Sequence, residues 1–452
     1  MTTSTTASTE HPSVFDAALP TVDYGDWLDR EAAHQSIREA RQHAPIAFGP
    51  YGPEVLDYDL VRTMLRDSRF AIPQGIALVV QGITSGPVWD RVGKLLISLD
   101  GEEHHRLRRL VAKAFTPRAA ERMRNACVDV INGLVDPVAE VGNCDFVADV
   151  ANHYPIPIIC ALLGAPREDW QLFSQWASDI SKAFGCSVAE HESAILRAWD
   201  ALDGYLEGLI ERRRHSLTDD LISDLIRVED DGEHLSHDEM RNLALILLNA
   251  GTDTTRNQLA AAVQVFCDHP DQWALLAERP ELAPKAVEEV MRHSPIIFST
   301  LRKATEDVEL GEVLIPAGAY VIGSTAAANR DPAVYDDPER FHISRDDPPA
   351  MLTFGGGVHY CLGAHLARIE MAEALKVLAR RMPNLRRTGP APWKPDHRHR
   401  RPDNASHRVR RGTLRGQCDV PMTSMRQVGP CARARRASSV NSVASNASAK
   451  AT

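Results

Sequence analysis

A single uninterrupted helical pattern near the middle of the chain limits the architectures open to it. Ser236 and Glu239 are spaced as an N-terminal capping box. Apolar residues then recur at helical spacing as far as Phe266, and residues 268–270 end the pattern with a proline. A helix of about thirty residues is roughly 45 Å long. It must cross the whole domain, so the rest of the chain has to pack around it.

Helical patterns dominate from residue 102 to about 295, whereas strand-like pieces are few and local. The stretch 305–325 alternates and contains Pro316-Ala-Gly318, which is a hairpin signal. Residues 69–97 are mostly apolar, contain glycines and lack a strong period, which is typical of a functional lid. We predict a mainly α domain with a small β region over residues 21–394, preceded by a disordered Thr/Ser-rich leader over 1–20.

Composition excludes several classes of protein. The chain is 44% hydrophobic and 25% charged, which provides enough apolar material for a large core. No apolar run approaches the roughly 18 residues that span a bilayer, and the first twenty residues do not resemble a signal peptide. The eight cysteines are scattered without a C-x-x-C pair, which argues against a zinc knuckle or an iron–sulfur site. A reducing, cytoplasmic location and a monomer without a membrane anchor are therefore expected.

A glycine-rich loop around Cys361 is the second informative feature. It reads Phe354-Gly-Gly-Gly-Val-His359-Tyr-Cys361-Leu-Gly363 and runs directly into an apparent helix. The glycines let the backbone fold closely around the sulfur, and the N–H groups at the helix start favour thiolate over thiol. A cysteine thiolate is one of the axial ligands that proteins offer to haem iron. The alternative interpretation is a buried structural cysteine after a turn.

The spacing Phe354-x-x-Gly357-x-x-x-Cys361-x-Gly363 resembles the haem-binding loop of the cytochrome P450 family, in its bacterial-type form without an N-terminal anchor. The resemblance covers residues 35 to 394. It implies the P450 fold, with a long central helix over the haem, and it implies that Phe354, Cys361 and Gly363 belong to a binding site for haem b with Cys361 as the iron ligand.

The centre of the long helix carries the unusual sequence Ala250-Gly251-Thr252-Asp253-Thr254-Thr255. Glycine and hydroxyl residues are unfavourable inside a helix, and a broken local rule suggests a functional site. Ala250 and Gly251 would let a flat cofactor lie against the helix, while Asp253 and Thr254 form an acid–alcohol pair that can relay protons. The patch resembles the oxygen-activation groove of the family. The alternative is a kinked helix in which threonine bonds to the previous turn.

Glu289 and Arg292 lie three residues apart on one helix face. Alone they would be read as a surface ion pair worth a few tenths of a kcal/mol. They resemble the buried Glu–Arg pair of the family because residues 337–341 follow like the family's meander. The resemblance implies a structural network of Glu289, Arg292 and Arg340 behind the cysteine loop.

Haem carries two propionates, and such anions need hydrogen-bonded cations. By resemblance, His104, Arg108, Arg302 and His359 would bind them; the alternative for each is a solvated surface charge. Basic residues that follow on the same helical stretch would flank the proximal face and steer an acidic electron donor. They are Arg109, Lys113 and Arg118.

The resemblance implies a monooxygenase that inserts one atom of O₂ into a lipophilic small molecule. Electrons would come from NAD(P)H through a ferredoxin reductase and a ferredoxin, because the chain has no flavin or iron–sulfur module of its own. Substrate-contacting candidates are 72–97, Leu247, Leu248 and 296–300. The alternatives are a peroxide-driven peroxygenase and a haem-binding protein without catalysis, either a sensor or an inactive relic.

Residues 395–452 depart from the family. They carry 12 Lys/Arg against 3 Asp/Glu and have no apolar period, whereas the whole chain has a net charge of −10. Such a basic tail could be a nucleic-acid arm, but we expect no nucleic-acid partner. Plausible GC-rich codons for Asp396 to Arg410, read one base out of phase, yield a strand-like segment. We therefore hypothesise a frame-shifted, disordered end, which the nucleotide sequence would decide.

Overall fold

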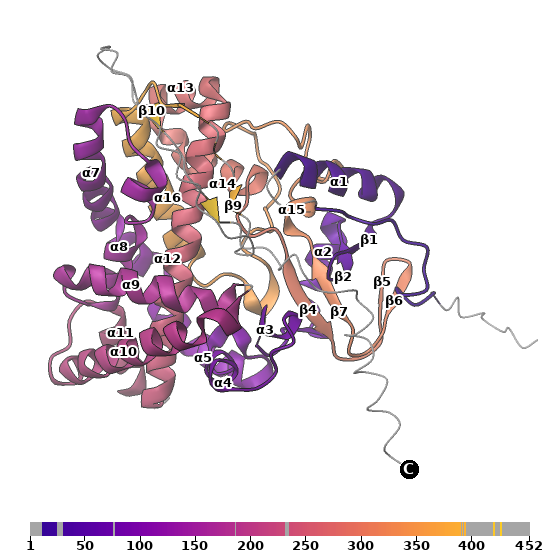
Figure 1. The fold of residues 1–452 in the computed structure, drawn as a ribbon, viewed down its shortest axis with the longest axis horizontal. Coiled ribbons are helices and arrows are strands. Elements are labelled where there is room, and N and C mark those ends of the chain that lie inside the picture. The colour runs from indigo at the N-terminus through magenta and orange to yellow at the C-terminus, as the bar shows by residue number, and fades with distance from the viewer. Residues whose placement is uncertain are drawn as a thin grey trace, which may run out of the picture.

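The structure is a computed structural model that describes residues 11–24, 30–75, 77–185, 187–230, 235–389, 391, 393–394, 419–420 and 425–426. Helix α12 (His237–Asp268) runs through the middle of the helical part (Figure 1). The Ser236 hydroxyl accepts from the Glu239 N–H at 3.2 Å, and the Glu239 carboxylate accepts from the Ser236 N–H at 2.7 Å. The predicted capping box and long central helix are confirmed.

Helices surround α12 on most sides and bury its apolar faces. Those that contact it directly include α8, α9, α10 and α16, and α16 also packs on α7 and α14. Helices α7 and α8 each end at a glycine in the left-handed conformation, Gly142 and Gly164. The helices of this part are α5 (Gly101–Ala114), α6 (Pro117–Arg122), α7 (Arg124–Val141), α8 (Pro155–Leu163), α9 (Trp170–Ile180), α10 (Val188–His215), α11 (Leu221–Asp230), α13 (Pro270–Glu278), α14 (Ala283–His293) and α16 (Ala364–Arg381).

Short single-turn helices connect these elements. They are η1 (Leu96–Ser98), the π-helical η2 (Phe146–Ala151), η3 (Arg167–Asp169), η4 (Ser181–Phe184), η5 (Pro280–Leu282) and η6 (Gly357–His359). Within the segment predicted as a lid, the structure has α3 (Ala77–Val80) and α4 (Pro87–Val92). Leu78, Val88 and Val92 are buried against the main core, so this segment is anchored by apolar packing.

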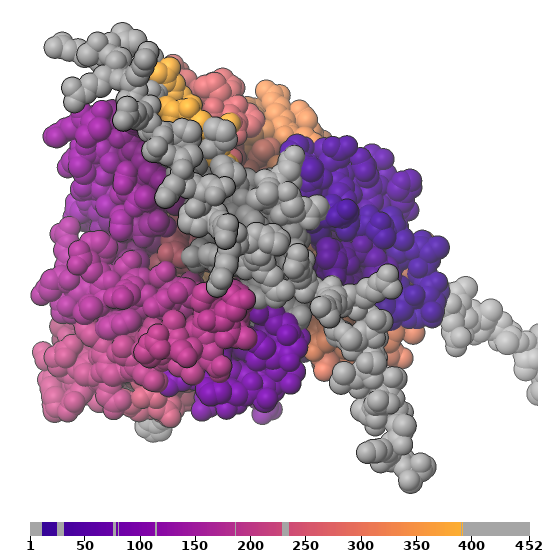
Figure 2. Space-filling view, viewed as in Figure 1, coloured from indigo at the N-terminus to yellow at the C-terminus, as the bar shows by residue number. Residues whose placement is uncertain are grey.

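The β region lies beside the helices (Figure 1). Its sheet has the order β1-β2-β7-β4-β3, with β2 parallel to β7 and the other pairs antiparallel. The strands are β1 (Ile46–Gly49), β2 (Gly52–Val55), β3 (Phe70–Ala71), β4 (Thr300–Ala304) and β7 (Tyr320–Gly323); α1 (Arg30–His43), α2 (Tyr58–Met64) and α15 (Thr325–Ala328) accompany them. Figure 2 shows the same division at the surface, with the indigo N-terminal part on one side and the magenta helices on the other. The predicted mainly α architecture with a small β region is confirmed.

The hairpin in the alternating stretch 305–325 turns at a different place from the one predicted. Strands β5 (Val308–Leu310) and β6 (Val313–Ile315) pair antiparallel around Gly311, which has a φ of 63°. Pro316-Ala-Gly318 instead joins β6 to β7. The alternation predicted strands correctly. The segment contains two turn signals, however, and Gly311 rather than Pro316-Ala-Gly318 forms the turn between the paired strands β5 and β6.

The N-terminal residues are more ordered than the sequence predicted. A disordered leader was expected over 1–20, yet the N–H of Val14 donates to the carbonyl of Leu314 at 2.8 Å, and Val22 donates to Phe48 at 2.8 Å. Val14 is fully buried. For residues 11–20 the prediction is therefore wrong, because pairing with strand edges far along the chain supplies the contacts that local composition lacks.

Most of the basic tail lies outside the described residues, so the frame-shift hypothesis stays a prediction. Two short pieces of it are described. Strand β10 (Asp419–Val420) pairs parallel with β8 (Arg386–Arg387), and β11 (Met425–Arg426) pairs parallel with β9 (Trp393–Lys394).

One helical stretch, Phe146–Leu163, has the length and apolar composition of a bilayer span, contrary to the sequence-based expectation that no such run exists. In the structure 61% of it is buried, as in the core helix of a folded domain. Ile156, Ile158 and Ile159 on α8 all belong to the main hydrophobic core. The apolar character of this stretch is thus explained by packing against α12.

A buried acid on β2 predicts a pH-dependent stability. Glu54 is 1% exposed, and the Tyr24 hydroxyl donates to its carboxyl group. Burial raises the pKa of Glu54 to about 7, although hydrogen bonds from Tyr24 and Ser324 oppose the shift. Because the folded pKa lies above the unfolded value, the native protein loses stability as the pH rises from about 4.5 through 7.

The variant Glu54→Gln removes this loss. We expect its free energy of unfolding to match the wild type near pH 5 and to exceed it at pH 8, by roughly 3 kcal/mol. Urea unfolding at both pH values measures the difference. Glu309→Gln, at an exposed position of β5, is the control and should show no such dependence. An equal effect of Glu54→Gln at both pH values would contradict the prediction.

Candidate functional site

The Cys361 loop is shaped by glycines whose conformation or surroundings exclude a side chain. Gly355 and Gly357 have φ of 73° and 63°, in the left-handed region. A Cβ on Gly357 would collide with the carbonyl oxygen of Leu65. The N–H of Cys361 donates to the carbonyl of Phe354 at 2.9 Å, which closes the loop. The sulfur is thereby fixed immediately before α16.

Opposing effects act on the thiol of Cys361. Burial raises its pKa, while the N–H of Gly363 and the positive charges of Arg108 and Arg368 lower it. The sequence predicted the contribution of the helix start correctly but overestimated its weight, because burial dominates. The free thiol therefore keeps its proton, and a metal ion must displace it on binding. Protein atoms thus crowd the thiol, although the residue as a whole is exposed.

Arg368 supports the loop and was not predicted as a site residue. Its guanidinium lies over the ring of Phe354, 4.5 Å from the centroid, and its Nε donates to Glu288 at 2.5 Å. It also contacts the Tyr360 hydroxyl at 3.3 Å. A sequence signal existed, since Arg368 lies on one face of α16 seven residues, or about two turns, after Cys361.

Four predicted anion-binding residues come together around the loop. The rings of His104 and His359 lie 4.1 Å apart, and His359 Nε2 is 3.5 Å from Asp100 Oδ1. Arg108 donates to the carbonyl of Tyr360, next to the cysteine. Arg302 lies within electrostatic reach of His359. Residues from α5, β4 and the cysteine loop thus form one cationic cluster.

The electrostatics of this cluster fit an anionic ligand. Arg302 is 3% exposed, and the described hydrogen bonds of its guanidinium go to Thr300 Oγ1 at 2.6 Å and Leu301 O at 2.9 Å rather than to a carboxylate. Burial lowers its pKa to about 10. Burial, with His359 and Arg108 nearby, lowers the pKa of His104 to about 4. A carboxylate bound here would stabilise the charged forms of Arg302 and His104 and so raise the pKa of both groups.

Two ring nitrogens support the same conclusion. His104 Nδ1 is buried without a hydrogen-bond partner within the described part of the chain, and His359 Nε2 has only its 3.5 Å contact with Asp100 there. Buried polar atoms normally have a partner. The chain's own residues therefore fit the two propionates of the haem that the sequence resemblance implies, with Cys361 as its expected iron ligand.

The polar patch of α12 divides between its faces. Ala250 is exposed, and Thr254 Oγ1 donates to its carbonyl at 2.6 Å, which is the back-bonding that the alternative interpretation proposed. Asp253 pairs with Arg256 one turn later. Among the described contacts, Asp253 thus contacts Arg256 and Thr254 contacts the carbonyl of Ala250, and none joins the side chains of Asp253 and Thr254.

Gly251 has a packing role that the sequence did not predict. A Cβ at this position would lie 2.6 Å from Cδ1 of Ile159, so its small size serves the close packing of α8 on α12. The expectation that a flat cofactor lies against Gly251 stays a prediction. Ala250 is exposed, and Gly251 and Leu247 are partly accessible, whereas Leu248 is 1% exposed and belongs to the core.

A buried acid behind the patch was missed by the sequence analysis. Thr255 Oγ1 donates to Oε2 of Glu370 on α16 at 2.9 Å. Burial raises the pKa of Glu370 to about 8, although this hydrogen bond opposes the shift. The carboxyl group is thus neutral at pH 7. The only sequence signal was an acid within an otherwise apolar face of α16.

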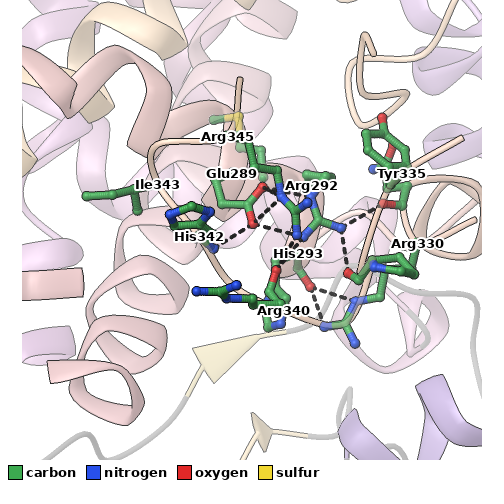
Figure 3. Close-up of polar contacts among 12 residues, drawn as sticks. Glu289, Arg292, His293, Arg330, Tyr335, Arg340, His342, Ile343 and Arg345 are labelled. Carbon is green, nitrogen blue, oxygen red and sulfur yellow. Dashed lines mark hydrogen bonds and ion pairs between the residues drawn. The ribbon is translucent and has the colours of Figure 1, made fainter. Parts of the chain in front are cut away.

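The Glu–Arg network behind the loop has a different third member from the predicted one. Arg292 donates to Glu289 at 2.7 and 2.9 Å, and both side chains are buried. Arg345 Nε donates to the two oxygens of Glu289 at 3.0 and 3.1 Å. Arg340 is exposed and takes part only through its carbonyl, which accepts from Arg292 and Arg345 (Figure 3). The prediction of Arg340 as the third member is therefore wrong.

The remaining predicted residues lie at accessible positions. Arg109, Lys113 and Arg118 are exposed on α5 and α6. Of residues 296–300, Ile296 and Phe298 are buried, whereas the other three are partly accessible. The segment 296–300 thus offers alternate side chains to a ligand and to the core.

Comparison with known proteins supports one family. Residues 89–278 and 270–382 match the family model described as Cytochrome P450. Mycinamicin IV hydroxylase/epoxidase from Micromonospora griseorubida is 41% identical over 343 residues, which cover 75% of this chain and 84% of that protein. Luteothin monooxygenase from Streptomyces thioluteus is 37% identical over 399 residues, covering 86% and 95%.

Solved structures agree with the sequence relatives. The crystal structure of CalO2 has a TM-score of 0.73 at 31% identity and covers 78% of this chain and 89% of its own. A single-residue mutant of MycG in complex with mycinamicin V has a TM-score of 0.70 at 36% identity, covering 82% and 94%. The chain therefore belongs to the cytochrome P450 family, whose members carry a haem iron, and is a monooxygenase.

Proposed function

We propose that this enzyme inserts one oxygen atom from O₂ into a lipophilic small molecule, with electrons from NAD(P)H that arrive through a ferredoxin reductase and a ferredoxin. The observation that carries the proposal is the cationic cluster of His104, Arg108, Arg302 and His359 beside an exposed Cys361. The named activities of relatives, such as a vitamin D(3) 25-hydroxylase at 39% identity over 293 residues, support a lipophilic substrate.

The residues of the cluster would hold a haem from two directions. Cys361 would bind the iron, and the cationic cluster would hydrogen-bond the propionates. Arg368 would keep Phe354 and the loop in place around the sulfur. When bound, the haem iron would supply the activation of O₂. Apolar residues on the accessible face of α12, such as Leu247, would exclude water from the substrate.

Residues of α12 would supply protons to the site. Thr254 Oγ1 would donate a proton into the site once its bond to Ala250 O opens. The Asp253 carboxylate can exchange Arg256 for a water and pass a proton toward Thr254. Both residues are partly accessible, so this exchange needs only side-chain rotation. We further propose that exposed Arg109, Lys113 and Arg118 receive the acidic ferredoxin.

Two measurements on purified protein test this function. The reduced, carbon monoxide-bound protein should have a Soret band typical of thiolate ligation, and product formation should require ferredoxin, reductase and NAD(P)H. Turnover with hydrogen peroxide alone at a comparable rate would favour the peroxygenase. Haem binding without turnover under either condition would favour a sensor or an inactive protein. A protein that binds no haem would overturn the proposal.

A further inference from the structure

Asn249 differs from the other polar side chains in the middle of α12 because its side-chain oxygen has no described hydrogen-bond partner. From Thr252 to Gln258 each polar side chain has a described partner, for example Leu248 O for Thr252 at 2.7 Å and Ser294 O for Gln258 at 3.0 Å. Asn249 is 7% exposed, and its Oδ1 is fully buried without a hydrogen-bond partner in the described part of the chain.

An unpartnered amide at this position is costly for the fold. Leaving a buried acceptor unsatisfied costs far more than an ordinary hydrogen bond contributes, and an apolar residue of the same shape would avoid the cost. Neighbouring Leu245, Ile246 and Leu248 are all buried and apolar, so an apolar residue would suit the surroundings. A partner beyond the described residues, such as a bound molecule, would remove this cost.

The position of Asn249 indicates what that partner is. Asn249 and Asp253 are four residues apart, so they lie one above the other on one helix face. At 3.6 residues per turn, partly accessible Asp253 lies between Asn249 and exposed Ala250 around the helix, so Asn249 is near the edge of the accessible side, where the oxidised molecule would lie under the proposed function. A polar group on that molecule can reach Asn249 while its apolar body contacts the accessible side.

We propose that Asn249 is a specificity-determining residue whose Oδ1 accepts a hydrogen bond from a hydroxyl or amide N–H group of the substrate. The inference rests on the proposed function and narrows its substrate class to lipophilic molecules that carry such a donor. Asn249 orients the substrate; it does not take part in proton delivery.

Iron-coordinating azoles test this without knowledge of the natural substrate. The probes are 4-phenylimidazole and its three hydroxyphenyl isomers, titrated by absorbance into holoprotein of the wild type and of Asn249→Leu. We expect at least one hydroxyl isomer to lose roughly three- to tenfold in affinity in the variant, while the parent compound keeps its affinity. Asn132→Leu, at a partly buried asparagine on α7, is the matched control. It should leave the affinity of each hydroxyl isomer relative to the parent compound unchanged.

Thermal unfolding of the same holoproteins provides a second readout. Because leucine replaces an unpartnered amide by an apolar group of similar shape, Asn249→Leu should unfold at the same or a higher temperature than the wild type. If Asn249→Leu does not accumulate as holoprotein, Asn249→Ala takes its place for the titrations. Failure of all azoles to bind the wild type would overturn the proposed function itself. Unchanged isomer ratios, or a clear loss of stability in Asn249→Leu, would overturn only the role of Asn249.

Discussion

Cys361→Ser is expected to abolish the thiolate-type Soret band of the reduced, carbon monoxide-bound protein and to reduce product formation on the order of a hundredfold or more. Thiolate donates electron density to the iron and favours cleavage of the O–O bond. A serine hydroxyl at the same position is far less acidic, and burial, which already raises the pKa of the Cys361 thiol, would hold the hydroxyl proton more firmly still. Absorbance spectra and turnover with ferredoxin and reductase measure both effects.

Cys267→Ser provides the control for this substitution. Cys267 lies near the end of α12 and is only partly buried, and burial raises the pKa of its thiol to about 12. Removing that sulfur should leave the spectrum and turnover intact. If Cys361→Ser kept an unaltered spectrum and full turnover, the iron ligand would have to be another residue, and the site assigned around the loop would be wrong.

Features encoded within a few residues could be predicted from the sequence. The capping box of Ser236 and Glu239 and the glycines of the cysteine loop act through local backbone geometry, so their spacing is sufficient to recognise them. The ion pair of Glu289 and Arg292 is likewise set by one helical turn. These local signals, with the resemblance they carry, predicted the long helix and the position of the proposed iron ligand.

Features that depend on distant segments could not be predicted. Gly251 is small because Ile159, on another helix, packs against it, and no periodicity in α12 reveals that neighbour. Leu248 is buried whereas Leu247 is only partly buried, and this difference likewise depends on helices that are distant in the sequence. The ordered structure of residues 11–20 depends on pairing with β6, some three hundred residues later, and with β1, a few tens of residues later.

The identity of the third arginine illustrates the same limit. Arg340 and Arg345 lie five residues apart in a segment without regular structure, and either could reach Glu289 in an extended chain. Asp337, with a φ of 46°, turns the backbone in the left-handed region. In the resulting path Arg345 faces Glu289 and Arg340 faces solvent. The resemblance to a family motif predicted that a further arginine is required but assigned the role to Arg340 instead of Arg345.

The network of Glu289, Arg292 and Arg345 should contribute strongly to stability. Glu289→Ala should lower the free energy of unfolding of the holoprotein by about 3–5 kcal/mol and reduce the haem content, because it leaves two buried guanidinium groups without their carboxylate. Arg345→Ala should cost about 3 kcal/mol, since it removes a charge-assisted pair and three further bonds to the carbonyls of Asp336, Asp337 and Arg340. Urea unfolding and the haem-to-protein ratio measure both.

Arg340→Ala is the matched control, because it removes an arginine from the same segment while its carbonyl remains as an acceptor for Arg292 and Arg345. An exposed substitution of this kind should change the free energy of unfolding by no more than about 0.5 kcal/mol. Equal losses in Arg340→Ala and Arg345→Ala would contradict the network, and the reverse order would restore Arg340 as its third member. Since Met291 O, one residue before Arg292, accepts from Thr353 next to the cysteine loop, loosening the network should displace the loop that holds Cys361.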